Sequence, residues 1–123
     1  KPVMLLALLD NVSGAGELPE PVLVDAFWSF YRRREALGLP AEVASSLLSR
    51  PEAATMAQVR ALLVGMPLER FVIQGYLQHF PEPGRVRVRP EVWEGLRYRD
   101  VLALRLALEE QIQGYFGGFM AGA

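Results

Sequence analysis

The chain has 123 residues, of which 51% are hydrophobic and 22% charged, so it can form one domain around one core and is not wholly disordered. It contains no cysteine and one histidine, which excludes disulfides, thiol catalysis, thiolate zinc sites, iron–sulfur clusters and multi-histidine metal sites. The net charge of −1 argues against a uniformly basic nucleic-acid protein, although twelve of the thirteen cations are arginine.

The first segment is an apolar run over residues 3–9. It is too short to cross a membrane and has no small-residue cleavage site, so it predicts neither a membrane span nor a signal peptide. We expect a buried helix that starts near Pro2 and ends at Gly14 or Gly16. Because the first residue is Lys1 and not methionine, we expect the chain to be part of a longer protein. The expected location is the cytoplasm.

Three further helices are expected in the middle of the chain. Apolar residues recur at helical spacing over 22–37, Gly38 fits a left-handed cap, and a shorter helix is expected over 41–49. Thr55 and Gln58 have the spacing of a capping box, which predicts the start of another helix. Gly65 and Pro67 are expected to end that helix.

A β-hairpin is expected next. Residues 71–77 are rich in β-branched and aromatic side chains, Pro81 to Gly84 form a turn, and residues 85–89 alternate strictly. Trp93 and Leu96 are then expected to pack on the core. Helices followed by a hairpin and a closing helix predict a mainly helical α+β domain of winged-helix type.

A last helix is expected over 100–116. Its predicted buried stripe consists of Val101, Leu104, Leu108, Ile112 and Tyr115 or Phe116. The folded domain is therefore expected to cover residues 1–116, with 117–123 as a flexible tail or a piece of linker.

The alternating strand is the most informative segment. Its pattern places Val86 and Val88 on one face and Arg85, Arg87 and Arg89 on the other. Three guanidiniums on one face repel one another unless carboxylates or phosphates compensate them, and arginine suits both partners. We favour contact with nucleic-acid backbone. An edge strand protected by its charges, or a patch for a protein partner, remains an alternative.

Charge is distributed unevenly along the chain. Residues 1–31 hold one cation and four acids, a net charge of −3, whereas residues 60–105 hold eight arginines and five acids, a net charge of +3. A nearly neutral total is therefore compatible with a local basic face. Arg97 and Arg99 follow the hairpin and are expected to assist it.

The helix after Thr55 takes the position of a recognition helix in a winged helix-turn-helix. Of its expected outward residues, Gln58 and Arg60 can read base edges by hydrogen bonds. Two such groups are few for sequence-specific contact. Binding is therefore expected to depend mainly on phosphates and nucleic-acid shape.

Catalysis is not expected of this domain. His79 has no Ser, Asp or Cys arranged as a partner, which indicates a surface or packing histidine, and Glu109 and Glu110 cannot share a helix face. No nucleotide-binding glycine loop is recognisable. We expect no cofactor and no metal.

Several stretches resemble a module of bacterial DEAD/DEAH-box helicase-like proteins of the restriction and defence type. They are the leucine-rich opening after Lys1-Pro2, Phe27-Trp28-Ser29-Phe30-Tyr31-Arg32-Arg33-Arg34, Met66-Pro67-Leu68-Glu69-Arg70-Phe71, and Val92-Trp93-Glu94-Gly95-Leu96 with Asp100. The opening is also similar to that of sulfur-recognising domains in phosphorothioate-dependent restriction endonucleases. No helicase motor motif is present, so the resemblance implies an accessory domain.

The favoured function is therefore non-catalytic binding of nucleic acid, with double-stranded DNA preferred, inside a larger DNA-processing or defence protein. Arg85, Arg87 and Arg89 would contact phosphates, helped by the other four residues named above: Gln58, Arg60, Arg97 and Arg99. The alternative is a protein-interaction or oligomerisation domain. No membrane partner is expected, and homo-oligomerisation is left open.

Overall fold

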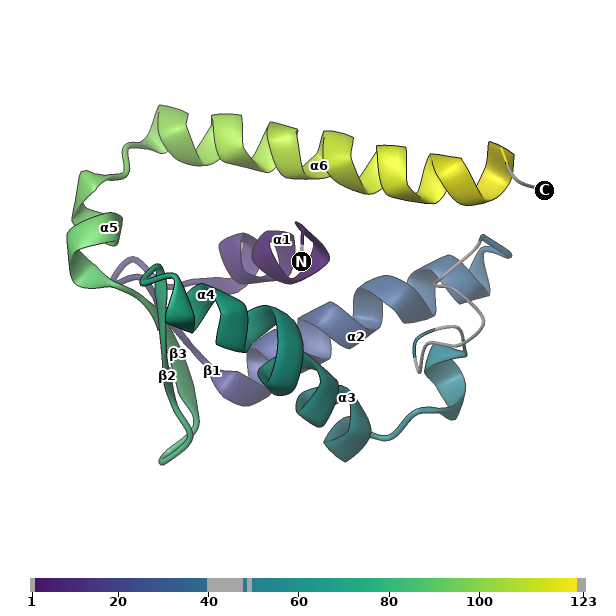
Figure 1. The fold of residues 1–123 in the computed structure, drawn as a ribbon, viewed down its shortest axis with the longest axis horizontal. Helices are drawn as coiled ribbons and strands as arrows, with labels where there is room; N and C mark the ends of the chain where they lie inside the picture. Colours follow the sequence, from purple (N-terminus) through teal and green to yellow (C-terminus); the bar gives the residue numbers. More distant parts are fainter. Residues whose placement is uncertain (1, 40–47, 49, 122–123) are drawn as a thin grey trace.

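The computed structural model describes residues 2–39, 48 and 50–121, which form a mainly helical α+β fold with a three-stranded antiparallel sheet (Figure 1). The elements in chain order are α1 (Pro2–Asn11), β1 (Glu17–Pro19), α2 (Glu20–Ala36), the 3-10 turn η2 (Pro51–Ala53), α3 (Met56–Leu63), the π-helical turn η3 (Val64–Leu68), α4 (Glu69–Ile73), β2 (Leu77–Phe80), β3 (Arg85–Val88), α5 (Pro90–Gly95) and α6 (Tyr98–Ala121). The expected α+β, mainly helical class is confirmed. The helix expected over 41–49 lies outside the described residues, apart from Leu48.

The sheet contains a strand that the sequence did not predict. Strand β1 pairs antiparallel with β3, and the strand order is β1-β3-β2. Strand β3 is therefore central, so the alternative of a charge-protected edge strand is wrong. Three residues with one apolar side chain, Leu18, give no alternating pattern, and pairing with β3 decides their conformation.

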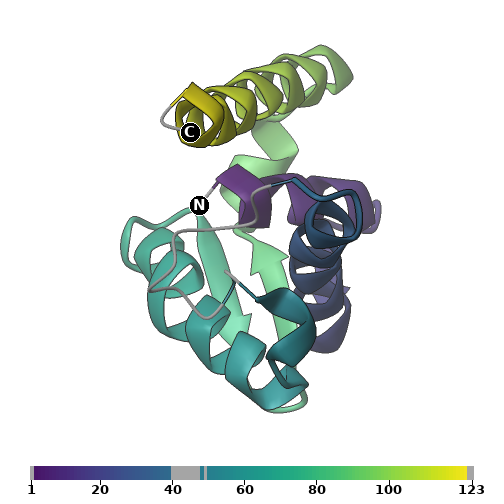
Figure 2. The ribbon, with the colours of Figure 1, turned by 90° about the vertical axis from the view of Figure 1, so that its right-hand side faces the viewer.

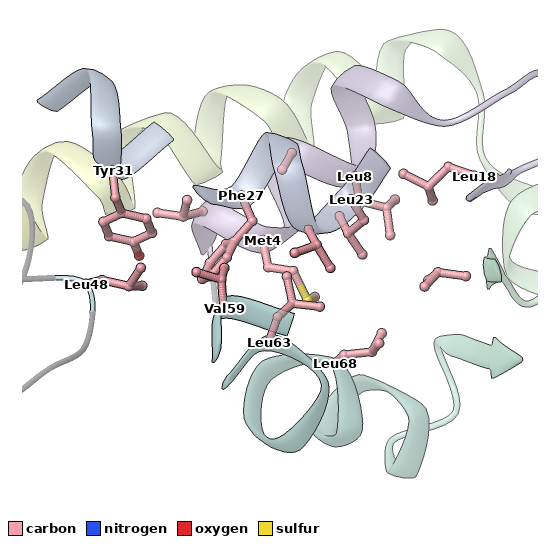
Figure 3. Close-up of a cluster of buried hydrophobic side chains, with 14 of the residues drawn as sticks. Met4, Leu8, Leu18, Leu23, Phe27, Tyr31, Leu48, Val59, Leu63 and Leu68 are labelled. Carbon is pink, nitrogen blue, oxygen red and sulfur yellow. The ribbon is translucent and has the colours of Figure 1, made fainter. Parts of the chain in front are cut away.

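One face of the sheet belongs to the core. Leu18 and Val86 are opposite each other in the register, as are Leu77 and Val88, and all four are buried. They join a single cluster with apolar residues of the helices. Figure 3 shows its centre, where Met4 and Leu8 of α1 meet Leu23 and Phe27 of α2 and Val59 and Leu63 of α3.

The chain between α3 and the hairpin differs from the prediction. The helix does not end at Pro67: it widens into η3, and α4 then continues through Phe71 to Ile73. The strand expected over 71–77 is therefore wrong, and β2 begins at Leu77. Proline lacks an N–H and crowds the preceding turn, and the wider π-helical turn accommodates it without ending the helix.

The capping box at the start of α3 is confirmed. The Thr55 side chain accepts a hydrogen bond from the Gln58 backbone N–H, and the Gln58 side chain accepts one from the Thr55 N–H. We expect Thr55→Ala to lower the free energy of unfolding by about 1 kcal/mol, because a helix N–H loses its partner. Thr55→Ser keeps an acceptor and should cost less; equal losses in thermal denaturation would contradict this role of the hydroxyl.

Helix α6 packs along α1 on the side away from the hairpin turn (Figure 1). Leu108, Ile112 and Phe116 are buried as predicted, whereas Leu104 is 37% exposed, so its expected place in the buried stripe is wrong. The helix continues to Ala121 and so includes most of the segment expected as a tail. No helix in the described part of the chain is long and apolar enough to cross a membrane.

Candidate nucleic-acid interface

The outer face of the sheet brings two of the predicted arginines together. Arg87 of β3 lies between Glu17 of β1 and Gln78 of β2, and Arg85 lies between Pro19 and Phe80 in the next outward row. Alternation along β3 produces this arrangement, because the intervening Val86 points into the core. The paired strands thus hold two guanidiniums on one half-buried surface.

Neutral neighbours hold these guanidiniums. Nε and Nη2 of Arg87 donate to Oε1 of Gln78 at 2.9 and 2.5 Å. The guanidinium carbons of Arg85 and Arg87 lie 4.8 and 5.2 Å from the centre of the Phe80 ring, within the range of cation–π attraction. These contacts order both side chains without cancelling their charge.

Compensation of Arg85 by an acid is partial. Its Nη1 lies 3.4 Å from Oε2 of Glu17, and both side chains remain more than a third exposed. Nε of Arg85 is buried and has no hydrogen-bond partner within the part of the chain that the structure describes. Because the Arg85 side chain is 40% exposed and its ion pair with Glu17 is long, the outer face retains donor capacity suited to an anion.

Arg89 lies just beyond β3 and differs from the other two. It precedes α5, and its Nε donates to Oε1 of Glu91 at 2.6 Å. This hydrogen bond holds the pKa of the exposed Glu91 carboxyl below its ordinary value. Arg89 is near the predicted site, but a carboxylate already compensates it.

The predicted residues of α3 have structural partners. Gln58 takes part in the capping box described above. Arg60 forms an ion pair with Glu20 from the first turn of α2. Both residues remain exposed, but Oε1 of Gln58 and Nε of Arg60 already have partners within the domain.

Sequence reasoning missed the most buried charged group of the described residues, Glu20. Its side chain is 5% exposed and lies between Arg60 and His79, whose Nε2 is 2.5 Å from Oε2 of Glu20. The backbone N–H of Glu20 also donates to the carbonyl of Gly84 in the hairpin turn. His79 is thus mostly buried and has a carboxylate partner that the sequence analysis did not identify.

The environment of Glu20 favours its ionised form. Burial alone raises the pKa of this carboxyl, but the hydrogen bonds and charges of His79 and Arg60 outweigh burial and leave the pKa below 4.5. The ionised carboxylate accepts hydrogen bonds, so Nε2 of His79 carries a proton in this contact. The three residues connect the hairpin, α2 and α3, and so fix the hairpin against the helices.

The remaining predicted arginines lie elsewhere. Arg97 precedes α6 and Arg99 is exposed in its first turn, at the end of the domain away from the hairpin turn (Figure 1). Arg85 and Arg87 thus share the outer face of β3, and Arg89 follows the strand directly. Gln58 and Arg60 lie on α3, and Arg97 and Arg99 lie beyond α5.

A hollow away from the sheet has charged residues in its lining. This hollow, of about 580 Å³, lies between α1 and α2, and its charged lining includes Arg32, paired with Asp25, and Asp10, paired with Arg105. Among the described residues, no three His, Cys, Asp or Glu side chains gather as metal ligands. Comparison of the chain with protein families, curated proteins and solved structures finds no match.

Proposed function

We propose that this domain binds nucleic acid without catalysis, with double-stranded DNA as the preferred ligand, and that it does so as a winged-helix accessory domain of a larger DNA-processing or defence protein. The element order supports the winged-helix interpretation: α1, β1, α2, α3, then the hairpin β2–β3, with the sheet order β1-β3-β2. The hairpin turn and α3 both lie on the side of the domain away from α6 (Figures 1 and 2).

The observation that carries this proposal is the pair of guanidiniums on the outer sheet face. Arg85 and Arg87 are ordered by Phe80 and Gln78, which are neutral, and the single acid in their two rows is Glu17. Preordered side chains lose less rotamer freedom on binding. The Arg85 side chain is 40% exposed, and a phosphate can accept hydrogen bonds from its guanidinium.

The proposed binding mode is contact with the phosphate backbone of the nucleic acid. The exposed residues of α3 include Ala57 and Ala61, which have no polar side-chain atoms, and Gln58 and Arg60 already have partners. The helix therefore offers little direct base readout. Affinity should depend strongly on salt and weakly on sequence.

The test is to replace Arg85, Arg87 and Arg89 together with alanine and measure binding of a labelled duplex by fluorescence anisotropy over a salt series. We expect affinity at low salt to fall roughly 100-fold. The slope of log affinity against log salt should become shallower by about 2–3, because binding releases fewer counterions when fewer phosphates are contacted.

A matched variant separates this face from total charge. Arg33, Arg50 and Arg70 are exposed and lie outside the hairpin. Replacing all three with alanine changes the net charge of the chain by the same amount as the first triple variant. That variant should lose much less affinity and keep most of the slope. Equal losses in both triple variants would refute a role for the sheet face, and no binding by the unaltered chain at low salt would favour a protein-interaction domain instead.

A further inference from the structure

The outer side of α6 is an unpartnered helix face. The helix packs on α1, with Leu108 and Ile112 buried, and no other element of the described residues covers the opposite side (Figures 1 and 2). On that side Leu106 is 62% exposed and Leu102 is 43% exposed. Exposed leucines in consecutive turns of one helix are typical of an interaction surface.

The charges on this face are arranged in a particular order. At 100° per residue, Arg99, Ala103, Leu106 and Glu110 lie within about 60° of one another around the helix. The order along the axis is a cation, a small residue, a large residue and an acid. Neither Arg99 nor Glu110 has an ion-pair partner among the residues that the structure describes.

The other charged pair of α6 is already used. Arg105 pairs with Asp10 of α1 and lies 3.3 Å from Glu109 of its own helix. These contacts fasten α6 to α1 and determine which side of the helix faces outward. Arg99 and Glu110 are therefore left on the exposed side, about 11 residues apart, or roughly three helical turns.

We propose that this face pairs with the same face of a second copy of the chain, with the two α6 helices antiparallel. In the register that places Arg99 opposite Glu110 of the second copy, Leu106 lies opposite Ala103 and Leu102 lies opposite Ala107. Because such a dimer has two-fold symmetry, each of these contacts occurs twice. Large residues opposite small ones allow the helices to approach closely. The opposite charges attract each other at both ends of the contact.

A parallel pairing does not fit the same face. It would place Arg99 opposite Arg99 and Glu110 opposite Glu110, so both ends would repel. The face is therefore self-complementary in one orientation. The hairpin turns lie away from α6, so dimerisation leaves the outer sheet face of each copy accessible (Figure 1).

The test measures the oligomeric state of the 123-residue chain by sedimentation equilibrium over a concentration series. We expect a reversible dimer with a dissociation constant below about 1 mM. Leu106→Glu should weaken it roughly 100-fold or more, because a carboxylate would be buried at the centre of the contact. Leu104→Glu is the matched control: Leu104 is also an exposed leucine of α6 but lies on another side, so this variant should dimerise normally.

Charge reversal tests the orientation. Arg99→Glu and Glu110→Arg should each weaken self-association roughly tenfold, and the double variant should restore it, because every opposed pair is again attractive. Native mass spectrometry of a mixture of the two single variants should show mainly heterodimer. A chain that stays monomeric, a dimer insensitive to Leu106→Glu, or a double variant without recovery would each overturn the proposal.

Discussion

Replacing Glu20 with Gln is expected to lower the free energy of unfolding by about 2–4 kcal/mol at pH 7. The amide keeps the shape of the side chain but removes the negative charge between Arg60 and His79. The cost is large because Glu20 is buried and its partners lose a charged acceptor. The hairpin also loses its main polar link to α2 and α3. Chemical denaturation at neutral pH measures this loss.

The same contact predicts how stability depends on pH. The pKa of Glu20 lies below its ordinary 4.5 in the folded chain, so below that pH the unfolded chain binds the proton first. The stabilisation by the ionised carboxylate is therefore fully present above about pH 5 and is lost as the pH falls through the folded pKa. The stabilities of the unaltered chain and of Glu20→Gln should converge in acid.

A second carboxylate serves as the control for Glu20. Glu94 in α5 is exposed and has no ion-pair partner among the described residues. Glu94→Gln should leave both the stability at pH 7 and its decline in acid nearly unchanged. A constant difference between Glu20→Gln and the unaltered chain from neutral to acid pH would show that ionisation of Glu20 does not stabilise the fold.

Gly16→Ala is expected to cost about 2–4 kcal/mol of stability. Gly16 has a φ of +80°, which side-chain-bearing residues rarely adopt, and a Cβ there would lie 2.7 Å from Cγ of Trp93. The Trp93 ring would have to move, although its Nε1 donates to the Gly14 carbonyl at 3.0 Å. The backbone of Gly16 also accepts a 2.8 Å hydrogen bond from Val88, so the strain reaches the sheet.

Gly38 separates the two sources of strain. Its φ is +71°, but a Cβ would meet no atom of the described residues within 4 Å. Gly38→Ala should therefore cost about 1 kcal/mol, and the excess loss in Gly16→Ala measures the clash with Trp93. Combining Gly16→Ala with Trp93→Leu should cost less than the sum of the two single changes. Similar losses for both glycines would argue against a rigid position of Trp93.

Local signals in the sequence determined much of the helical framework. The Thr55–Gln58 capping box, the cap at Gly38 and the turn ending at Gly84 need contacts within a few residues, so spacing alone predicts them. The alternation of β3 likewise predicted which side chains face outward. The prediction of a strand from Phe71 was wrong. Pro67 and the β-branched residues near it are typical of the end of a helix, whereas in the folded chain the helix continues through η3 into α4.

Only the tertiary structure decided the environment of the charges. Nothing near Glu20 in the sequence shows that it meets Arg60, 40 residues later, and His79, 59 residues later. Strand β1 is too short to be predicted, and its pairing converts the arginine strand from an edge into the centre of a sheet. The sequence thus determined which residues carry charge and which face of β3 they occupy. Long-range packing decided which of those charges are compensated, because ion pairing depends on distance in space.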